Sequence, residues 1–482
     1  MTSKKKKHKK SSRILLIKNI LFVFQIVISI LLVGAVILSG MLPARYIVAL
    51  TVFLVLLVLV SYMLLNRKEK IWMAGAAFAA IVSLICCVAF GYLNQMRGLL
   101  NESREKYKVD EMVVVVLADD PAETLADTGD YVFGIQTGVD QVNTQAMIKD
   151  VEENLGKKIT IREYETPRDE ASALLNKEIG AAIYNNSYTS MLDDLIEGYT
   201  DQVKIIYNYG IEQDLEAESV DPGEPFNVLI SGIDVRENVL ENSRSDVNII
   251  VTINPKTKKI ILTSTPRDFY VPISGVSGQT RDKLTHAGIY GVDASMRTLE
   301  DLYGIDITYY VRVNFNTLVQ VVNALDGVDV YIEEGFQPFT DSEIYIESGW
   351  QTLDGREALA YCRERYSFAD GDNQRGRNQE TVLQAIIAKI CSPSILLNAG
   401  DFMSSLEGAF QTDIPNAKIQ ELINQQLSDS TPWQVFKQAP TSENYQMQPT
   451  YSGGPTPLSV VYPDYYIVKQ CSARINIIME GR

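Results

Sequence analysis

The feature that most constrains this chain is a set of three long apolar runs near its N-terminus, at residues 14–41, 47–65 and 71–93. A helix needs roughly 17 to 25 mostly apolar residues to cross the hydrocarbon core of a bilayer, and each run is long enough. A cleaved signal peptide explains the first run poorly, because its apolar stretch is long and two more runs follow directly. The sequence therefore predicts three transmembrane helices within residues 20–94.

Positive charge predicts how these helices are oriented. A basic tail, residues 1–19, precedes the first helix. Arg67, Lys68 and Lys70 fill the loop between the second and third runs, whereas the loop between the first and second contains only Arg45. Lysine and arginine are enriched on the cytoplasmic side of a membrane. We therefore expect a multi-pass cell-membrane protein with a cytoplasmic N-terminus and extracytoplasmic C-terminal domains.

Charge also separates the two parts of the chain. Residues 1–107 hold 15 Lys and Arg against 3 Asp and Glu, a net charge of +12, which leaves −28 for the remainder because the whole chain carries −16. Surfaces that bind nucleic acid are basic, so the acidic outer part argues against nucleic acid as its partner. The lysine run within residues 4–10 is typical of a signal for topology and anionic lipid. Membrane lipid is therefore an expected partner, and nucleic acid is not.

Cysteine and histidine provide no clear metal or nucleophile signature. Cys86 and Cys87 fall inside the third apolar run, and the other three cysteines follow no Cys-x-x-Cys spacing. The two histidines, His8 and His286, are too few for an ordinary zinc site, and His286 is expected to be structural. Standard phosphate-loop, dinucleotide and nucleophile-elbow motifs are absent from the sequence. Any chemistry must therefore come from other side chains.

The outer part alternates strand-like and helix-like segments in two units. In the first, strands are expected at 112–118, 158–164, 181–184 and 203–209, and helices at 139–153, 168–175 and 188–196. In the second, which follows an acidic linker at 212–225, strands are expected at 226–233, 247–253, 260–264, 309–313 and 328–332, and helices at 294–302, 315–325 and 378–390. Alternation of this kind indicates a mostly parallel or mixed sheet covered by helices. The predicted organisation is an accessory α/β domain at 108–215 and a larger α/β domain at 225–482.

Arginines of the second unit are the first candidates for chemistry, because they are expected at strand ends or in loops of an acidic region: Arg244, Arg267, Arg363, Arg365 and Arg375. An extended chain would point the guanidinium groups of Arg363 and Arg365 to one face. Arg375 and Gln379 would share a face if their helix starts early enough. Guanidinium groups form planar donor forks suited to phosphate oxygens. For any single arginine, pairing with a nearby carboxylate is the better explanation.

Two aspartates are the acidic candidates. Asp234 ends the first strand of the second unit, and Asp246 lies at the start of the next. Carboxylates at neighbouring strand ends would suit Mg²⁺, which keeps its other positions for phosphate and water. Aspartate more often stabilises a turn or caps a helix, and this is the alternative role for both residues. Spacing alone does not decide between them.

Six stretches, in order, resemble the LytR-CpsA-Psr (LCP) family of Gram-positive cell envelopes. They are NVLISGIDVR from Asn227, RSD from Arg244, TSTPRD from Thr263, KLTHA from Lys283, DGVDV from Asp326 and LDGREALAYCRER from Leu353. Six ordered matches within one domain are far more specific than any one alone. The three apolar runs and the extra α/β unit look like the streptococcal capsule branch of that family.

The resemblance implies a membrane-anchored α/β protein with an accessory domain and a larger LCP domain, whose mixed sheet is covered by helices. It implies a transferase that moves a capsular or other wall glycopolymer from an undecaprenyl-pyrophosphate carrier to peptidoglycan, with Mg²⁺-assisted cleavage of the donor. Lipid pyrophosphatase activity is a further expectation. The implied partners are the lipid-linked polysaccharide, peptidoglycan and other capsule assembly proteins.

Site residues follow from the same resemblance, position by position. Pyrophosphate binding falls on the five arginines named above and on Gln379. Catalytic roles fall on Arg244, Asp246 and Arg267, and metal binding falls on Asp234 and Asp246. Asp246, or a water near it, is also a candidate acceptor for the proton of the acceptor hydroxyl, ranked below its metal role. One departure is Asn378, where the family often has arginine.

Two other functions remain open from the sequence. One is a membrane-bound regulator or attenuator of capsule gene transcription that acts through the basic tail, although residues 1–19 leave no room for a helix-turn-helix domain. The other is a polyprenyl-phosphate binding module without catalysis.

Overall fold

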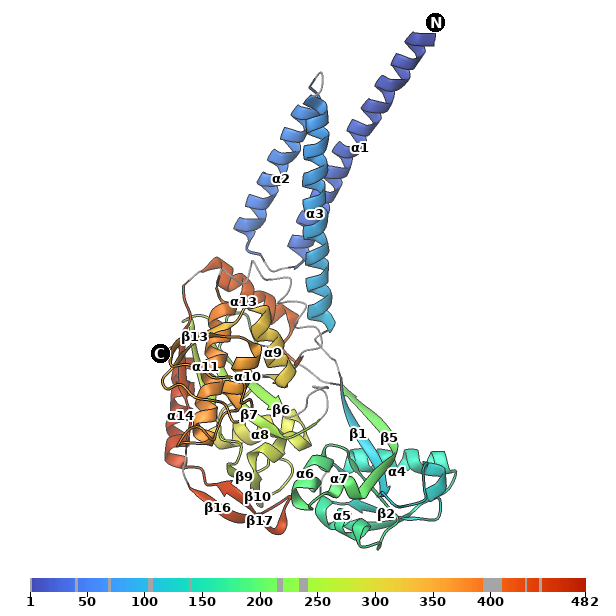
Figure 1. Ribbon diagram of the computed structural model, residues 1–482, viewed down its shortest axis with the longest axis vertical. Helices are drawn as coiled ribbons and strands as arrows, with labels where there is room; N and C mark the ends of the chain where they lie inside the picture. The colour runs from blue at the N-terminus through green and yellow to red at the C-terminus, as the bar shows by residue number, and fades with distance from the viewer. Residues whose placement is uncertain are drawn as a thin grey trace. The chain divides into compact units, whose positions relative to one another are not determined.

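The structure is a computed structural model of the chain (Figure 1). It describes residues 2–39, 42–67, 71–102, 107–138, 140–214, 220–233, 242–392, 410–429, 431–441 and 444–482. The chain divides into two units, one formed by Met1–Glu102 with Pro415–Thr431 and the other by Ser103–Ile414 with Pro432–Arg482.

Three long helices dominate the first unit: α1 (Thr2–Ser39), α2 (Ala44–Leu65) and α3 (Ile71–Glu102). Each contains a segment long and apolar enough to span a membrane, which confirms the predicted set of three. The helices lie side by side (Figure 1). Gly75 on α3 permits a close approach to α2, because a Cβ at this position would lie 2.8 Å from the Leu64 Cβ.

Helix α13 (Asn416–Ser428) belongs to the same unit. Arg45 donates through Nη2 to the carbonyl oxygens of Leu427, at 2.5 Å, and Ser428, at 3.0 Å. The last carbonyls of a helix have no partner within the helix and lie at the negative end of its dipole, so a guanidinium group suits them. Arg45, in the first turn of α2, therefore contacts a helix from a distant part of the chain.

The first half of the second unit is a five-stranded sheet in the order β3-β2-β4-β1-β5. Its strands are β1 (Tyr107–Leu117), β2 (Val132–Gln136), β3 (Thr160–Tyr164), β4 (Ala181–Asn185) and β5 (Val203–Asp214). Its helices are η1 (Leu125–Thr128), α4 (Gln141–Leu155), α5 (Pro167–Leu175), α6 (Tyr188–Leu195) and α7 (Tyr199–Gln202). Strand β2 was not predicted from the sequence. We call this part the accessory subdomain.

Burial explains why β1 is central in that sheet. Met112 to Val116 are all buried, and successive side chains of a strand point to opposite faces. Val113 and Val115 pack in the cluster that contains Met191 of α6, whereas Met112 and Val114 pack on the other side with Met147 of α4. The continuous valine run therefore becomes a strand covered by helices on both faces.

The remaining part contains a six-stranded sheet in the order β14-β11-β6-β7-β8-β15. Its strands are β6 (Phe226–Ile233), β7 (Ser245–Asn254), β8 (Lys259–Ser264), β11 (Tyr309–Val313), β14 (Phe410–Thr412) and β15 (Gln434–Gln438). The β6/β11 and β8/β15 pairs are parallel, and the other three pairs are antiparallel, which confirms a mixed sheet. Outside this sheet lie the short hairpins β9 (Tyr270–Pro272) with β10 (Arg281–Lys283), β12 (Val328–Ile332) with β13 (Gly349–Leu353), and β16 (Tyr445–Thr450) with β17 (Gly454–Val461).

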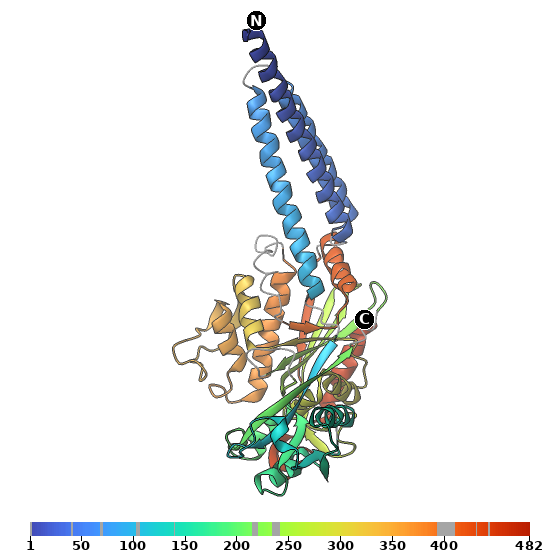
Figure 2. The same ribbon diagram turned by 90° about the vertical axis from the view of Figure 1, so that its right-hand side faces the viewer.

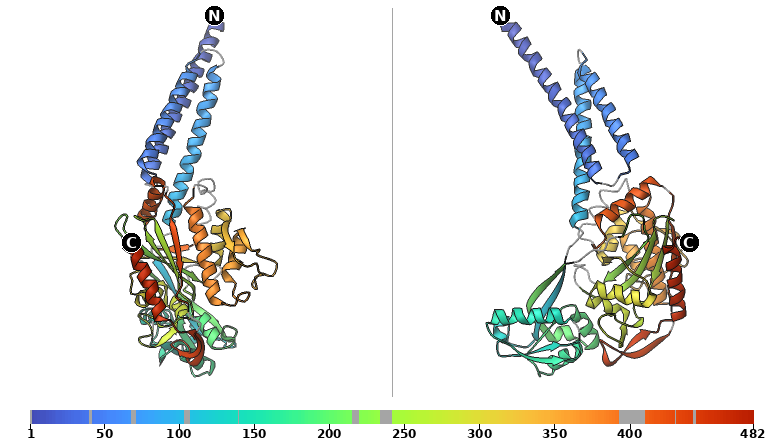
Figure 3. Two further views of the ribbon diagram at one scale, coloured as in Figure 1. Left: turned by 90° about the vertical axis from the view of Figure 1, so that its left-hand side faces the viewer. Right: turned by 180° about the vertical axis from the view of Figure 1, so that it is seen from behind.

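Helices cover both faces of the six-stranded sheet. Helices α8 (Val292–Tyr303) and α14 (Tyr465–Met479) pack on one face through a cluster that includes Leu229 and Ile250. On the other side lie α9 (Phe315–Ala324), α10 (Gly355–Arg363) and α11 (Asp372–Ile390). Figure 2 and the left view of Figure 3 show the orange helices and α14 on opposite sides of the strands.

Two helices that carry candidate arginines differ from the sequence prediction, and α13 and α14 were not predicted either. Helix α11 begins at Asp372, six residues before the predicted start at 378. The prediction missed the first two turns because they are polar and lack an apolar period. Helix α10 was not predicted at all. Its start is a capping box in which Asp354 and Glu357 exchange hydrogen bonds between side chains and backbone. Both differences move candidate arginines onto helices.

Glu170 of α5 provides a test of the accessory core. Its carboxyl is fully buried and accepts a hydrogen bond from the Ile183 backbone N–H at 3.0 Å. Burial raises its pKa well above the usual value of 4.5. A raised folded-state pKa means that the native state holds the proton more tightly, so stability falls as pH rises above 4.5, by up to about 1.4 kcal/mol per pH unit.

We expect Glu170→Gln to remove this pH dependence. Relative to the unsubstituted full chain, the variant should have an unfolding free energy that increases steadily as pH is raised from 4.5. Urea unfolding in detergent at several pH values measures it. The exposed Glu163→Gln variant is the control and should leave the pH dependence unchanged. Parallel pH profiles for Glu170→Gln and the unsubstituted chain would contradict the assignment.

Candidate active site

The centre of the candidate site is an ion pair between two neighbouring strands. Asp246 lies near the start of β7, and Arg267 follows the end of β8, and these two ends adjoin because the strands are antiparallel. Arg267 donates through Nη1 to both carboxylate oxygens of Asp246 at 2.8 Å. Thr285 donates to Asp246 Oδ1 at 3.1 Å. Strand pairing therefore brings two residues of the predicted site into contact.

Helix α11 adds a second arginine to the same place. Arg375 is buried and forms an ion pair with Asp372 at 2.8 Å, whereas Arg365 lies 3.8 Å from the same aspartate oxygen. Arg375 and Gln379 line one pocket together with Asp246 and Arg267. The early start of α11 thus places Arg375 and Gln379 on one face, as their spacing requires.

The N-terminal turn of α11 reaches this pocket and favours an anion there. A Cβ at Gly376 would lie 3.2 Å from the Ser264 hydroxyl, so glycine lets α11 approach the end of β8. The first turn of the 19-residue helix α11, from Asp372, supplies residues to the pocket. The N-terminal turn of a helix carries partial positive charge and unpaired N–H groups, which attract phosphate.

Electrostatics couple these groups. Burial tends to raise the pKa of the Asp246 carboxyl, but Arg267, Arg375 and Arg244 outweigh it and hold the pKa below its usual value. Burial, opposed by Asp372 and assisted by Arg267, lowers the pKa of Arg375. Asp246 is therefore a carboxylate at neutral pH and partly neutralises a cluster of positive charge.

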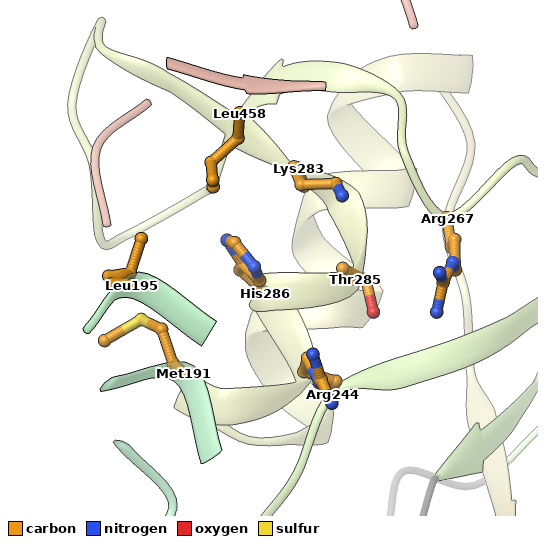
Figure 4. Close-up of a pocket in the computed structure, with 8 residues that line it drawn as sticks. All are labelled: Met191, Leu195, Arg244, Arg267, Lys283, Thr285, His286 and Leu458. Carbon is orange, nitrogen blue, oxygen red and sulfur yellow. The ribbon is translucent and has the colours of Figure 1, made fainter. Parts of the chain in front are cut away.

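A second pocket, of about 250 Å³, adjoins the first through Arg267, which lines both. Its other polar lining residues are Arg244, Lys283, Thr285 and His286, and its apolar ones are Met191, Leu195 and Leu458. Figure 4 shows the three apolar side chains gathered at one end, with Thr285 and Arg267 at the other and His286 between them. Met191 and Leu195 come from α6, so the accessory subdomain forms part of this pocket. Spacing within the larger domain offered no signal for that contribution.

Arg363 is not placed as the sequence suggested. It is the last residue of α10, so it does not share an extended strand with Arg365, and its guanidinium group stacks 4.4 Å from the Phe315 ring. That stacking is a cation–π contact. Arg365 lies beyond the helix end and is near Asp372, as described above. The expectation of one extended face for both groups was wrong because the capping box makes this segment helical.

Asn378 and Arg377 take structural positions on α11. Asn378 is fully buried and donates to the Tyr361 carbonyl oxygen at 3.0 Å, which ties α11 to α10. Arg377 pairs with Asp370 and with the Gln374 side chain. The helix therefore turns both residues away from the face that carries Arg375 and Gln379.

The magnesium prediction rests on two aspartates, of which Asp234 lies outside the described residues. Among the residues that the structure describes, no group of three or more His, Cys, Asp and Glu side chains could hold a metal ion. Asp246 offers hard oxygen ligands beside an anion pocket, and Mg²⁺ is often bound by one or two carboxylates with substrate phosphates. The described donor set therefore fits magnesium as one carboxylate, with phosphate and water as the remaining ligands.

These contacts define a class of protein: an α/β domain with an arginine-rich anion site at the end of a mixed sheet. A family model described as the LytR_cpsA_psr family matches residues 194–452, which is more than half of the chain. The chain belongs to the LytR-CpsA-Psr family. This finding confirms the resemblance seen in the sequence motifs.

Two relatives illustrate the similarity. The chain is 40% identical over 196 residues to the polyisoprenyl-teichoic acid–peptidoglycan teichoic acid transferase TagT of Bacillus subtilis, a match that covers 39% of this chain and 59% of that protein. It is 35% identical over 198 residues to the corresponding TagU of Enterococcus faecalis, which covers 40% and 62%. The chain thus spans about six-tenths of the length of these relatives.

Solved structures of the family are also similar. Bacillus subtilis TagV shares 26% identity with a TM-score of 0.46, and the match covers 54% of this chain and 98% of that one. A structure described as TagT bound to LI-WTA shares 30% identity with a TM-score of 0.45, and covers 55% and 95%.

Replacing Asp246 distinguishes a magnesium ligand from a residue that only pairs with Arg267. Without Mg²⁺, we expect Asp246→Asn to bind inorganic pyrophosphate at least as tightly as the unsubstituted chain, because a negative charge beside Arg267 is removed. With Mg²⁺, we expect the unsubstituted chain to gain about tenfold in affinity, or about 1.4 kcal/mol, and the variant to gain nothing. Isothermal titration calorimetry of the full chain in detergent measures both.

Asp341→Asn is the matched control, because Asp341 also pairs with an arginine, Arg356, but lies outside both pockets. It should follow the unsubstituted chain under both conditions. An equal Mg²⁺ effect on Asp246→Asn would exclude Asp246 as a magnesium ligand.

Proposed function

We propose that this protein transfers a capsular or other wall glycopolymer from an undecaprenyl-pyrophosphate carrier to peptidoglycan on the outer side of the cell membrane. The observation that carries the proposal is the cluster in which Arg267 and Arg375 surround one carboxylate, Asp246, and line a pocket with it. The names of the relatives, polyisoprenyl-teichoic acid–peptidoglycan teichoic acid transferases, support a lipid-linked donor and a peptidoglycan acceptor.

The arginine cluster suits the pyrophosphate of such a donor. Asp246 holds Arg267 in a defined position, and Asp372 does the same for Arg375. Donors fixed in advance cost no reorganisation when charge develops on a leaving phosphate, which makes electrostatic stabilisation effective. Arg267 and Arg375 would bind phosphate oxygens from the first pocket, and Arg244 from the adjoining one.

Magnesium is part of the proposal. Asp246, together with Asp234, would hold Mg²⁺, and the ion would supply further neutralisation of phosphate charge. The residues of the chain position the donor: Gln379 and Arg375 share a helix face, and Thr285 fixes the Asp246 carboxylate. Positioning and charge stabilisation are the main contributions that proteins make to phosphoryl transfer.

The membrane helices fit a donor of this kind. A polyprenyl tail is embedded in the bilayer, so a chain with three apolar helices meets its substrate at the membrane surface. We propose the orientation that the positive charges predict, with the tail at 1–19 inside and both α/β domains outside. Membrane lipid and other capsule assembly proteins are the remaining proposed partners.

A transfer assay tests the proposal. The full chain in liposomes receives a lipid-pyrophosphate-linked oligosaccharide, Mg²⁺ and peptidoglycan fragments, and the sugar attached to peptidoglycan is measured. We expect Arg267→Ala to reduce transfer at least about 100-fold, the effect of removing one preorganised charge-stabilising donor. Arg356→Ala is the matched control, because Arg356 is exposed and pairs with Asp341 and Glu343 away from the pockets. It should stay within about twofold of the unsubstituted chain.

Other outcomes would support other functions. Donor binding without transfer to any peptidoglycan fragment would favour a polyprenyl-phosphate binding module. Release of oligosaccharide phosphate into water would favour a lipid pyrophosphatase. Deletion of residues 4–10 that changes capsule transcripts but leaves wall attachment intact would favour a regulator.

A further inference from the structure

His286 lies in the second pocket, next to the proposed phosphate site. Its imidazole Nδ1 is 2.7 Å from Asp282 Oδ1, and the ring lines the pocket that Arg267 shares with the phosphate cluster. The sequence suggested a structural histidine. The structure instead places an imidazole, backed by a carboxylate, in a pocket that Arg267 also lines (Figure 4).

Asp282 is held as a fixed acceptor. It is fully buried, and its Oδ2 accepts hydrogen bonds from the Ser452 backbone N–H, at 2.9 Å, and from the Ser452 hydroxyl. Burial would raise its pKa, but His286 and Ser452 outweigh burial and hold the pKa below its usual value. Asp282 is therefore a carboxylate that can only accept hydrogen bonds.

This arrangement decides the tautomer of His286. Because Asp282 only accepts, Nδ1 must carry a hydrogen and donate it. In a neutral ring the other nitrogen, Nε2, then has a lone pair that can accept a proton. A carboxylate that orients a histidine in this way is a recurrent means of preparing a general base.

Asp246 is less suited to the same role. Both of its carboxylate oxygens accept from Arg267, and one also accepts from Thr285. The carboxylate that the sequence offered as a proton acceptor is thus engaged in holding the phosphate-binding arginine.

We propose that His286 is the general base that takes the proton from the acceptor sugar hydroxyl, that Asp282 is its positioning residue, and that the second pocket is the acceptor subsite. The inference rests on the proposed transferase function. The hydroxyl oxygen forms a bond to the phosphorus that carries the polymer. The bond from that phosphorus to the bridging oxygen breaks, polyprenyl phosphate leaves with the electron pair, and the hydroxyl proton moves to His286 Nε2.

The accessory subdomain supports this subsite. Ser187, just before α6, donates to the Ile289 carbonyl oxygen at 3.0 Å, and the Tyr188 and Tyr290 rings lie 5.7 Å apart. These contacts join α6 to the segment η2 (Leu284–Tyr290), which carries His286. Met191 and Leu195 then cover one side of the pocket with apolar surface, which limits the access of water to the base.

The test uses the full chain in the transfer assay described above. In His286→Asn, the side-chain amide can still donate to Asp282 but cannot take a proton. We expect transfer to fall at least about 100-fold, the usual contribution of a general base. Binding of the lipid-linked donor, measured separately, should stay within about twofold, and the unfolding temperature should not change. Asp282→Asn should lower transfer by a smaller factor, again with donor binding retained.

Chemical rescue distinguishes a proton acceptor from a structural residue. Free imidazole should restore part of the transfer by His286→Ala, because it can fill the space left by the side chain and take the proton. It should not restore Arg267→Ala, which serves as the matched control.

Three results would overturn the inference. The first is transfer by His286→Asn within about threefold of the unsubstituted chain. The second is a loss of donor binding equal to the loss of transfer, which would make His286 structural. In both of these the unsubstituted chain transfers polymer, so the proposed function stands. If the unsubstituted chain transfers nothing, the proposed function fails and this inference fails with it.

Discussion

The Asp246–Arg267 ion pair is the interaction on which the site depends. Arg267 and Arg375 are both largely buried, and like charges close together in a poorly solvated place repel one another strongly. One carboxylate that accepts two 2.8 Å hydrogen bonds from Arg267 offsets this repulsion. The same pair holds the guanidinium group in a fixed position, so the pyrophosphate of the proposed donor would meet donors that are already oriented. Removing either partner would leave the other charge buried and uncompensated.

The mixed sheet and its covering helices make this pair possible. Antiparallel pairing of β7 with β8 brings the start of one strand beside the end of the other, and the small Gly376 lets α11 carry Arg375 to the same place. The accessory subdomain reaches the adjoining pocket through Met191 and Leu195. Helix α6 of that subdomain is therefore one wall of the proposed acceptor subsite.

Much of the fold was predictable from local patterns. The strands at 226–233 and 309–313 have the predicted bounds, because short segments rich in β-branched and aromatic residues indicate buried strands. Helix α10 and the first two turns of α11 were not predictable in this way. Asp354 and Glu357 cap α10, and buried polar residues such as Asn378 leave no apolar period in α11. Arg363 was therefore predicted on an extended segment, whereas it lies at the end of a helix.

Three membrane-spanning helices, the mixed α/β class, the family and the candidate arginines were all predictable from the sequence, because length, apolar content and ordered motifs are local properties of the chain. Which of those arginines meet is seen only in the folded chain. Folding joined Arg267 to Asp246, set Arg363 against Phe315, and placed His286 between Asp282 and a pocket lined partly by α6. The physical reason is that each of these contacts depends on strand register, helix start and packing between segments far apart in the chain.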